Sequence, residues 1–235
     1  MLKVAIFDLD LCCIDTYSQG EDILDPVLKV ARESAPLDGS KLESLRRELM
    51  QENFDTVMNR YTLPSTTVSC MRSAYARLVA PPSTSTYGDM DALEALDMKR
   101  YLVSTGFYRF QMSKIHITGI LPYFEAVLID SLDNLSARKG KLDIFRAIRL
   151  HEGVASQDVV VIGDNPRSEL AAAKTLGMRT VQSVRPGVRR EDGFDAYILS
   201  FDALVNVRKH MDRLNQQLLR GDHAESYEVQ YARLE

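Results

Sequence analysis

The chain is poor in cysteine and histidine, and neither residue type shows the spacing of a metal site. The three cysteines are Cys12, Cys13 and Cys70, an odd number with two adjacent members and no C-x-x-C pair. This pattern argues against a disulfide framework and predicts reduced thiols. The four histidines lie far apart in the sequence, so we expect no local zinc motif.

Long apolar runs and an excess of positive charge are also missing. No stretch approaches the roughly 20 apolar residues of a membrane-spanning helix, and the first residues enter a strand pattern without the features of a signal peptide. The 29 Lys and Arg stand against 33 Asp and Glu, a formal net charge of −4, whereas nucleic-acid-binding surfaces usually show a basic excess. We therefore expect a cytoplasmic protein whose partner is a small molecule and that binds neither membrane nor nucleic acid. Nothing in the sequence indicates an oligomeric state.

The N-terminal apolar run Val4-Ala5-Ile6-Phe7 ends at two aspartates, Asp8 and Asp10. An uninterrupted apolar strand is typical of a parallel sheet that is buried on both faces. Such sheets bind ligands at the carboxyl edge of their strands. Residues two apart on extended backbone project to the same side, so the two carboxylates come close together. The pair therefore predicts a bound cation, a shared proton or a reaction at this edge.

Strand and helix patterns alternate over most of the chain beyond residue 90. Strands are expected at 4–7, 101–103, 126–129, 159–162, 180–182 and 196–198. Helices are expected at 90–96, after 107, and at 142–150, 167–176 and 201–219. This alternation implies right-handed crossovers, with helices on both faces of the sheet. The expected fold is therefore α/β, a doubly wound parallel sheet.

The residues from about 20 to 80 show helical patterns and interrupt this alternation. Apolar residues recur at near-helical spacing between Leu42 and Phe54 and between Val68 and Val79. The proline, serine and threonine run at 81–86 then breaks helix and favours extended backbone. We predict a helical cap at 15–84, inserted into a discontinuous core domain of residues 1–14 and 85–235.

Polar groups follow further expected strands and the connections between them. Strand 101–103 leads into Ser104-Thr105-Gly106, and strand 159–162 leads into Gly163-Asp164, with Glu169 five residues later. Lys139 and Lys141 precede the helix between these strands. A hydroxyl and backbone N–H groups at a helix start suit an anion. Carboxylates such as Asp8 and Asp164 suit a hard cation such as Mg²⁺, which neutralises a phosphoryl group.

In this order and spacing, the motifs resemble those of the haloacid-dehalogenase-like hydrolase superfamily. The resemblance covers about residues 3–200 and is to the phosphatase branch with a helical cap, similar to phosphoglycolate phosphatases and β-phosphoglucomutases. It implies that Asp8 is the nucleophile that forms an aspartyl-phosphate. It also implies that Asp10 is the general acid and base, and that Asp8, Asp164 and the backbone carbonyl of Asp10 hold Mg²⁺.

The same resemblance assigns the phosphate-binding groups. Ser104, Thr105 and Gly106 are implied to bind the phosphoryl group. Counting back from Phe145, Lys139 matches the helical-cap members, and Lys141 matches the shorter spacing of phosphoserine-phosphatase-like members. We favour Lys139 as the catalytic lysine that neutralises the nucleophile, with Lys141 as a phosphate-steering neighbour.

Glu169 stands where the family usually has aspartate. Because it is one methylene longer, it is expected to bind metal through water or to hold Lys139. Asn165 is expected to support the metal ligands with it, and also to cap the helix at 167–176. Cap arginines, and Phe107, Tyr108 and Arg109, are candidates to meet the substrate. These cap arginines are Arg32, Arg46, Arg47, Arg60, Arg72 and Arg77.

The first motif departs from the family pattern D-x-D-G-T, because Leu11 and Cys12 replace glycine and threonine. The loss of glycine restricts the turn, and a thiol is a weak hydrogen-bond partner. Slower turnover or an unusual substrate would follow, while Cys12 and Cys13 are expected to be buried, inert thiols.

The predicted function is a Mg²⁺-dependent phosphatase acting on a small phosphorylated metabolite. One alternative is a phosphomutase, in which the phosphoryl group returns to a sugar instead of passing to water. Another is a catalytically weakened binding protein of the same fold. The survival of every charged motif position favours activity.

Overall fold

A six-stranded parallel sheet forms the centre of the chain, which the computed structural model describes over residues 1–34 and 37–220. In sheet order, its strands are β5 (Ala126–Ser131), β4 (Lys99–Gly106), β1 (Val4–Phe7), β6 (Val159–Gly163), β7 (Arg179–Ser183) and β8 (Ala196–Ile198). Strand β1 is central, with Phe7 paired to Leu102 of β4 and Ile162 of β6. All six predicted strands are present, which confirms the α/β fold.

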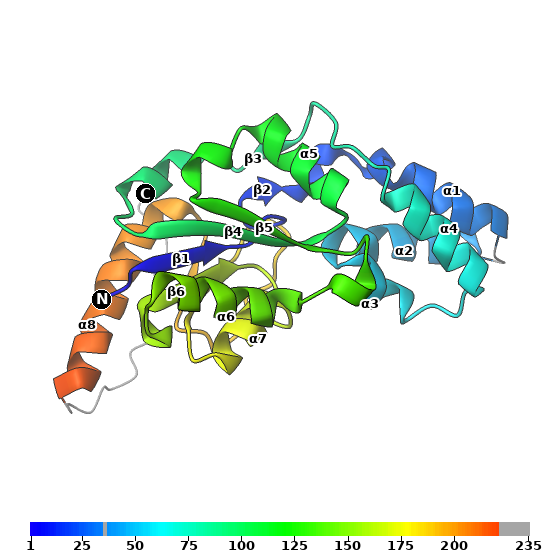
Figure 1. The fold of residues 1–235 in the computed structure, drawn as a ribbon. Helices are drawn as coiled ribbons and strands as arrows, with labels where there is room; N and C mark the ends of the chain where they lie inside the picture. Colours follow the sequence, from blue (N-terminus) through cyan, green and yellow to red (C-terminus); the bar gives the residue numbers. More distant parts are fainter. Residues whose placement is uncertain (35–36, 221–235) are drawn as a thin grey trace.

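The two faces of the sheet are covered by different helices (Figure 1). Val4 and Ile6 of β1 face α6 (Gly140–Glu152) and α7 (Glu169–Thr175). Ala5 and Phe7 face the opposite layer, which contains α5 (Tyr108–Thr118), α8 (Leu204–Arg220) and the 3-10 helix η3 (Met90–Ala95). Successive strand residues project to opposite faces, and β1 is fully buried on both. The site-bearing strand is thereby fixed from both sides, each large apolar side chain contributing roughly 1.5–3 kcal/mol.

Four helices form a second cluster beyond the carboxyl edge of the sheet (Figure 1). They are α1 (Asp25–Ser34), α2 (Gly39–Gln51), α3 (Phe54–Met58) and α4 (Ser65–Tyr75). Their buried side chains form a separate apolar cluster, which also takes in Phe107, Phe110 and Leu132 from the sheet domain. The side chains of Asp38 and Asn53 cap α2 and α3 by accepting from backbone N–H groups.

Two short strands join the cap helices to the sheet. β2 (Ile14–Asp15) pairs antiparallel with β3 (Ser85–Thr86), so the connection into the helices lies beside the connection out of them. This pairing supports the predicted division at residues 14 and 85, which stays a prediction. Residues 221–235 of the predicted core domain lie outside the described residues.

The helix expected at 167–176 starts later than predicted. Helix α7 begins at Glu169, and the side chain of Asn165 accepts from the backbone N–H of Arg167 in the preceding turn. The Asn165 side chain therefore closes a local turn instead of capping the helix. The segment expected to be a helix at 90–96 is the 3-10 helix η3.

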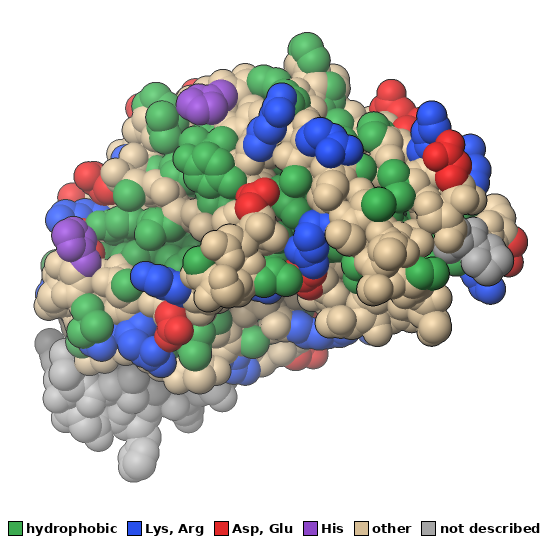
Figure 2. Space-filling model, turned by 45° about the vertical axis from the view of Figure 1, so that its right-hand side comes forward, with side chains coloured by type: hydrophobic (Ala, Val, Ile, Leu, Met, Phe, Trp, Pro, Cys, Tyr) green, Lys and Arg blue, Asp and Glu red, His purple; other side chains and the backbone are tan. Residues whose placement is uncertain are grey.

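The surface carries mixed charge on the face shown in Figure 2, where Lys and Arg side chains are interspersed with Asp and Glu. Among residues 1–34 and 37–220, no helix is long and apolar enough to cross a membrane. A cytoplasmic location and the lack of membrane or nucleic-acid partners stay predictions.

Candidate active site

Three carboxylates gather at the carboxyl edge of the sheet. Asp8 follows β1, Asp164 follows β6 and Glu169 begins α7, and one oxygen of each lies within 4.8 Å of the others. Gly163 makes this approach possible, because a Cβ at that position would collide with the Glu169 side chain. Carboxylate oxygens are the ligands that Mg²⁺ prefers. The cluster therefore offers oxygens that suit a magnesium ion, with Asp8 and Asp164 at the strand ends.

The cluster carries more negative charge than its protein neighbours balance. Burial raises the pKa of Asp8 to about 7 against the opposing attraction of Lys141, and Glu169 and Asp10 raise it further. Burial, then Glu169 and Asp8, raise the pKa of Asp164 well above its usual value. One lysine thus faces three carboxylates, and a divalent cation would complete the charge balance.

That lysine is Lys141, not the expected Lys139, and which of the two acts in catalysis stays a prediction. The Lys141 ammonium lies 2.8 Å from Asp8 Oδ1 and 2.8 Å from Glu169 Oε2, with its side chain 8% exposed. Lys139 is exposed and occupies the position before the first residue of α6. The physical reason is the phase of α6, which places Lys141 on the buried helix face with Ile144, Phe145 and Ile148.

Glu169 holds this lysine and also ties down the loop after β6. Its side chain is 1% exposed, with Oε2 accepting from Lys141 and Oε1 accepting from the backbone N–H of Asn165 at 2.6 Å. The expected link between Glu169 and a lysine is therefore present, but with Lys141. Asn165 contacts Glu169 through its backbone.

Asp130 is a supporting residue that the sequence analysis missed. It lies in β5, where its Oδ1 accepts from the backbone N–H of Gly140 at 2.9 Å. Its Oδ2 accepts from Arg138 Nε at 2.8 Å and from the Thr105 hydroxyl at 3.3 Å. Asp130 thus anchors the start of α6, the helix that delivers Lys141. The sequence signal for Asp130 was an acidic residue that follows an apolar strand. The same pattern identified Asp8 and Asp164.

Asp10 faces a different set of partners from Asp8. Its Oδ1 accepts from Lys114 Nζ at 2.7 Å and from the Thr16 hydroxyl at 3.1 Å. Its Oδ2 accepts from Lys114 at 2.9 Å and from Gln111 Nε2 at 2.8 Å. Burial alone would raise the pKa of Asp10, but Lys114 and these hydrogen bonds outweigh burial and hold it below its usual value. Neither Gln111 nor Lys114 was identified from the sequence.

The predicted phosphate loop lies at the end of β4. Ser104 is buried, and its Oγ accepts from Gln111 Nε2 at 2.7 Å. Thr105 and Gly106 follow it, and all three residues line a cavity between the sheet edge and the cap helices. Glycine suits position 106 on steric grounds, because a Cβ there would lie 2.8 Å from Gln111 Cδ. Whether Ser104, Thr105 and Gly106 bind phosphate stays a prediction.

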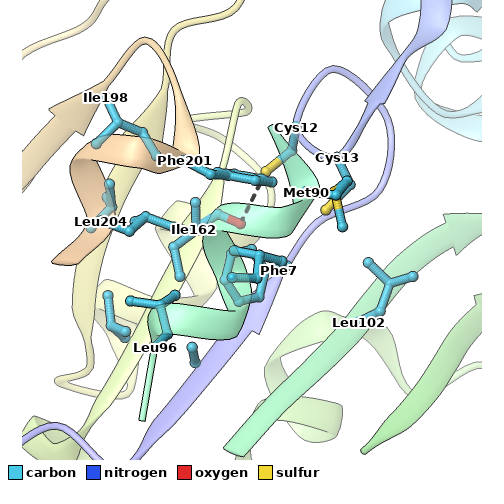
Figure 3. Close-up of a cluster of buried hydrophobic side chains, with 14 of the residues drawn as sticks. Phe7, Cys12, Cys13, Met90, Leu96, Leu102, Ile162, Ile198, Phe201 and Leu204 are labelled. Carbon is cyan, nitrogen blue, oxygen red and sulfur yellow. Dashed lines mark hydrogen bonds between the residues drawn. The ribbon is translucent and has the colours of Figure 1, made fainter. Parts of the chain in front are cut away.

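The unusual Leu11-Cys12 turn keeps a backbone shape suited to glycine. Leu11 has φ 53°, a left-handed conformation that costs a non-glycine residue roughly 1–3 kcal/mol. Cys12 and Cys13 are fully buried, and Cys12 packs with Phe7 and Phe201 in the apolar cluster of Figure 3. The Cys12 thiol donates to the backbone carbonyl of Ile162 at 3.7 Å, and burial raises its pKa well above the usual value. The expectation of buried thiols is confirmed.

A cavity of about 100 Å³ connects these groups to the cap helices. Its wall includes an aromatic cluster in which Tyr75 stacks on Phe107 with centroids 5.0 Å apart. Phe54 and Phe110 pack edge-on against this stacked pair, so the cluster joins cap to sheet domain. Other lining residues are Asp8, Asp10, Ser104, Leu49, Asn53 and Lys141.

The expected arginines do not line this cavity. The described lining residues include Lys114 and Lys141 but no arginine. Arg46 pairs with Asp25, Arg60 pairs with Glu48 and Glu52, and Arg72 pairs with Asp55. Of the three residues expected at the entrance, Phe107 lines the cavity, whereas Tyr108 and Arg109 are exposed elsewhere.

Comparison with known proteins agrees with this geometry. A family model described as a haloacid dehalogenase-like hydrolase matches residues 2–177, which confirms the resemblance drawn from the motifs. A glyceraldehyde 3-phosphate phosphatase of Pyrococcus abyssi is 26% identical over 196 residues, covering 77% of this chain and 81% of the relative.

Solved structures share the fold. A haloacid dehalogenase-like hydrolase from Streptococcus pneumoniae has a TM-score of 0.67 at 16% identity, covering 87% of this chain and 97% of that one. YfnB of Bacillus subtilis, solved bound to magnesium, has a TM-score of 0.60 at 14% identity, covering 88% of this chain and 98% of that one. At these identities the likeness shows the fold.

Proposed function

Because the chain belongs to the haloacid dehalogenase-like hydrolase family, we propose that it is a Mg²⁺-dependent phosphatase that cleaves a small phosphomonoester through an aspartyl-phosphate. The observation that carries the proposal is the arrangement around Asp8. Its carboxylate accepts from Lys141 and lies beside Asp164 and Glu169 at the end of the central strand. A carboxylate with this access and charge surroundings can serve as a nucleophile toward phosphorus.

The proposed hydrolysis has two steps, and residues of this chain act in both. An Asp8 oxygen attacks phosphorus, and the bond from phosphorus to the substrate oxygen breaks with its electron pair leaving on that oxygen. Water then attacks the phosphorus of the aspartyl-phosphate, which returns Asp8 and releases inorganic phosphate. Asp10, on the same strand end, is the acid of the first step and the base of the second. Lys141 balances charge on Asp8, and Ser104 binds the phosphoryl oxygens.

Asp8, Asp164 and the backbone carbonyl of Asp10 would hold the magnesium ion. When bound, Mg²⁺ neutralises phosphoryl charge and so allows an anionic nucleophile to approach. The excess of carboxylate over lysine in the cluster supports this assignment.

The cavity supports a compact substrate. Its volume of about 100 Å³ is well below the roughly 300–1,000 Å³ of pockets that take drug-sized ligands. The name of the Pyrococcus abyssi relative makes glyceraldehyde 3-phosphate the first substrate to test.

The test is release of inorganic phosphate from a panel of small phosphomonoesters, with Mg²⁺ and with EDTA. We expect turnover of at least one compact substrate, lost in EDTA and restored by Mg²⁺. A sugar phosphate that is isomerised without phosphate release would identify a mutase instead. A folded protein that binds Mg²⁺ but turns over nothing would favour a binding role.

The acidic cluster also predicts pH-dependent stability of the metal-free protein. The pKa of Asp8 is raised to about 7 in the folded chain, so the folded state binds more protons than the unfolded state between roughly pH 4 and 7. The free energy of unfolding then falls as pH rises through this window, by up to about 1.4 kcal/mol per pH unit. In EDTA, we expect the melting temperature to fall from pH 5 to pH 7.5 more steeply for wild type than for Asp8→Asn.

The difference should be about 5–10 °C, because the change between pH 5 and 7.5 amounts to about 2.5 kcal/mol and 1 kcal/mol shifts the melting temperature by roughly 2–4 °C in a chain of this size. Added Mg²⁺ should remove most of it. Parallel pH profiles for the two proteins in EDTA would contradict a raised pKa at Asp8.

A further inference from the structure

Asp10 is held by a bracket of three side chains, Lys114, Gln111 and Thr16. Each carboxylate oxygen accepts two hydrogen bonds, at distances between 2.7 and 3.1 Å. Lys114 contributes to both oxygens, so it fixes the carboxylate plane as well as its position. The Asp10 side chain remains 28% exposed and lines the cavity, whereas Lys114 is 5% exposed. Lys114, Gln111 and Thr16 line the same cavity, and the Asp10 carboxylate stays partly exposed within it.

The bracket is itself rigidly supported. Gln111 and Lys114 lie one turn apart on α5, and both are buried. The Lys114 ammonium sits 4.2 Å from the centroid of the Phe110 ring. The same Gln111 amide nitrogen donates to Asp10 and to Ser104 Oγ, so one side chain links the candidate acid and base to the candidate phosphate loop.

A buried ion pair of this kind is a poor device for stability alone. Desolvation of two charges offsets most of their attraction, and apolar replacements of such pairs are often neutral or stabilising. Lys114 is also poorly placed to bind a substrate anion, because its ammonium already lies 2.7 and 2.9 Å from the two carboxylate oxygens of Asp10. The remaining role for Lys114 is to fix the orientation of the Asp10 carboxylate.

We propose that Lys114 is a positioning residue that holds the Asp10 carboxylate in place to accept a proton from the water that hydrolyses the aspartyl-phosphate. The inference rests on the proposed function. In this step the water oxygen bonds to phosphorus, and the bond from phosphorus to the Asp8 oxygen breaks with its electron pair returning to Asp8. The water proton passes to Asp10 and from there to solvent.

The experiment uses the whole chain with Mg²⁺ and 4-nitrophenyl phosphate, whose good leaving group needs no proton donor. Hydrolysis of the aspartyl-phosphate is then the step that depends most on Asp10. The variants are Lys114→Met, Lys114→Gln and Lys114→Arg. Lys209→Met, at an exposed lysine of α8, is the matched control.

For both neutral variants we expect kcat and KM to fall together by about 10- to 100-fold, since a general base contributes roughly 10²–10⁴-fold. The ratio kcat/KM should stay within about threefold of wild type, because formation of the intermediate is unaffected. Rapid quenching should show a burst of nitrophenol and accumulation of phosphorylated protein. Lys114→Arg should recover part of kcat, and Lys209→Met should match wild type.

Other outcomes overturn the inference in distinguishable ways. A raised KM with unchanged kcat would show that Lys114 binds substrate. Equal losses in kcat and kcat/KM without accumulated phosphoprotein, together with a lower melting temperature, would show a structural role only. Two neutral variants that both fail to fold would show the same. A wild-type protein that releases neither nitrophenol nor phosphate would overturn the proposed function, and this inference with it.

Discussion

Asp8→Asn is expected to lower phosphate release by at least about 10⁴-fold while leaving the fold intact, because it removes the nucleophile and little else. Asparagine has the shape of aspartate but cannot form an aspartyl-phosphate. It also removes one of three crowded carboxylates, so in EDTA at pH 7.5 the variant should melt at or above the temperature of wild type. Activity and stability are thus expected to move in opposite directions.

The measurements are phosphate release with Mg²⁺, thermal melting, and the intact mass of protein quenched in acid during turnover. Wild type should carry a phosphoryl group on Asp8 after quenching, and the variant should carry none. Asp192→Asn is the matched control, since Asp192 is 87% exposed and far along the sequence from the site. A variant that keeps substantial turnover would rule out Asp8 as the nucleophile.

The strand ends of the site were predictable because they obey a local rule. An apolar strand followed by acidic or hydroxyl residues correctly located Asp8, Asp164 and Ser104 at one edge of the sheet. Parallel strands bring their carboxyl ends together whatever the loops between them do. The same rule would have found Asp130, had it been applied to the strand at 126–129.

Site side chains that come from helices were harder to predict. A shift of one residue along a helix rotates the side chain by about 100° around the helix axis. Phe110, Gln111, Lys114 and Ile115 are the buried face of α5, a spacing typical of one helix face. Polar residues at two of these positions were the available signal for the Asp10 bracket. The cap arginines failed as candidates for another reason. Arg46, Arg60 and Arg72 pair with acids of the cap helices or the turns beside them, which charge pattern alone does not reveal.

Because helix phase buries Lys141 and leaves Lys139 exposed, we expect opposite results for the variants Lys141→Met and Lys139→Met. Lys141 is the buried cation between Asp8 and Glu169, and these carboxylates raise its pKa although burial would lower it. Removing one partner of a buried pair costs roughly 3–5 kcal/mol, because the remaining charges are uncompensated. We expect Lys141→Met to lose stability on this scale and nearly all phosphate release. Lys139→Met should change the unfolding free energy by less than about 0.5 kcal/mol, as exposed substitutions usually do, and should keep near-normal turnover.

Loss of fold and loss of catalysis can be separated in the double variant Lys141→Met, Glu169→Gln. It removes one buried positive and one buried negative charge together, so the uncompensated charge that destabilises Lys141→Met is reduced. Stability should recover in part, measured by urea unfolding, while phosphate release should stay low because Asp8 still lacks its cation. If turnover recovers along with stability, Lys141 acts through the fold alone. If Lys139→Met is the variant that loses turnover, the exposed lysine reaches the site during the reaction, and the spacing argument from Phe145 was right.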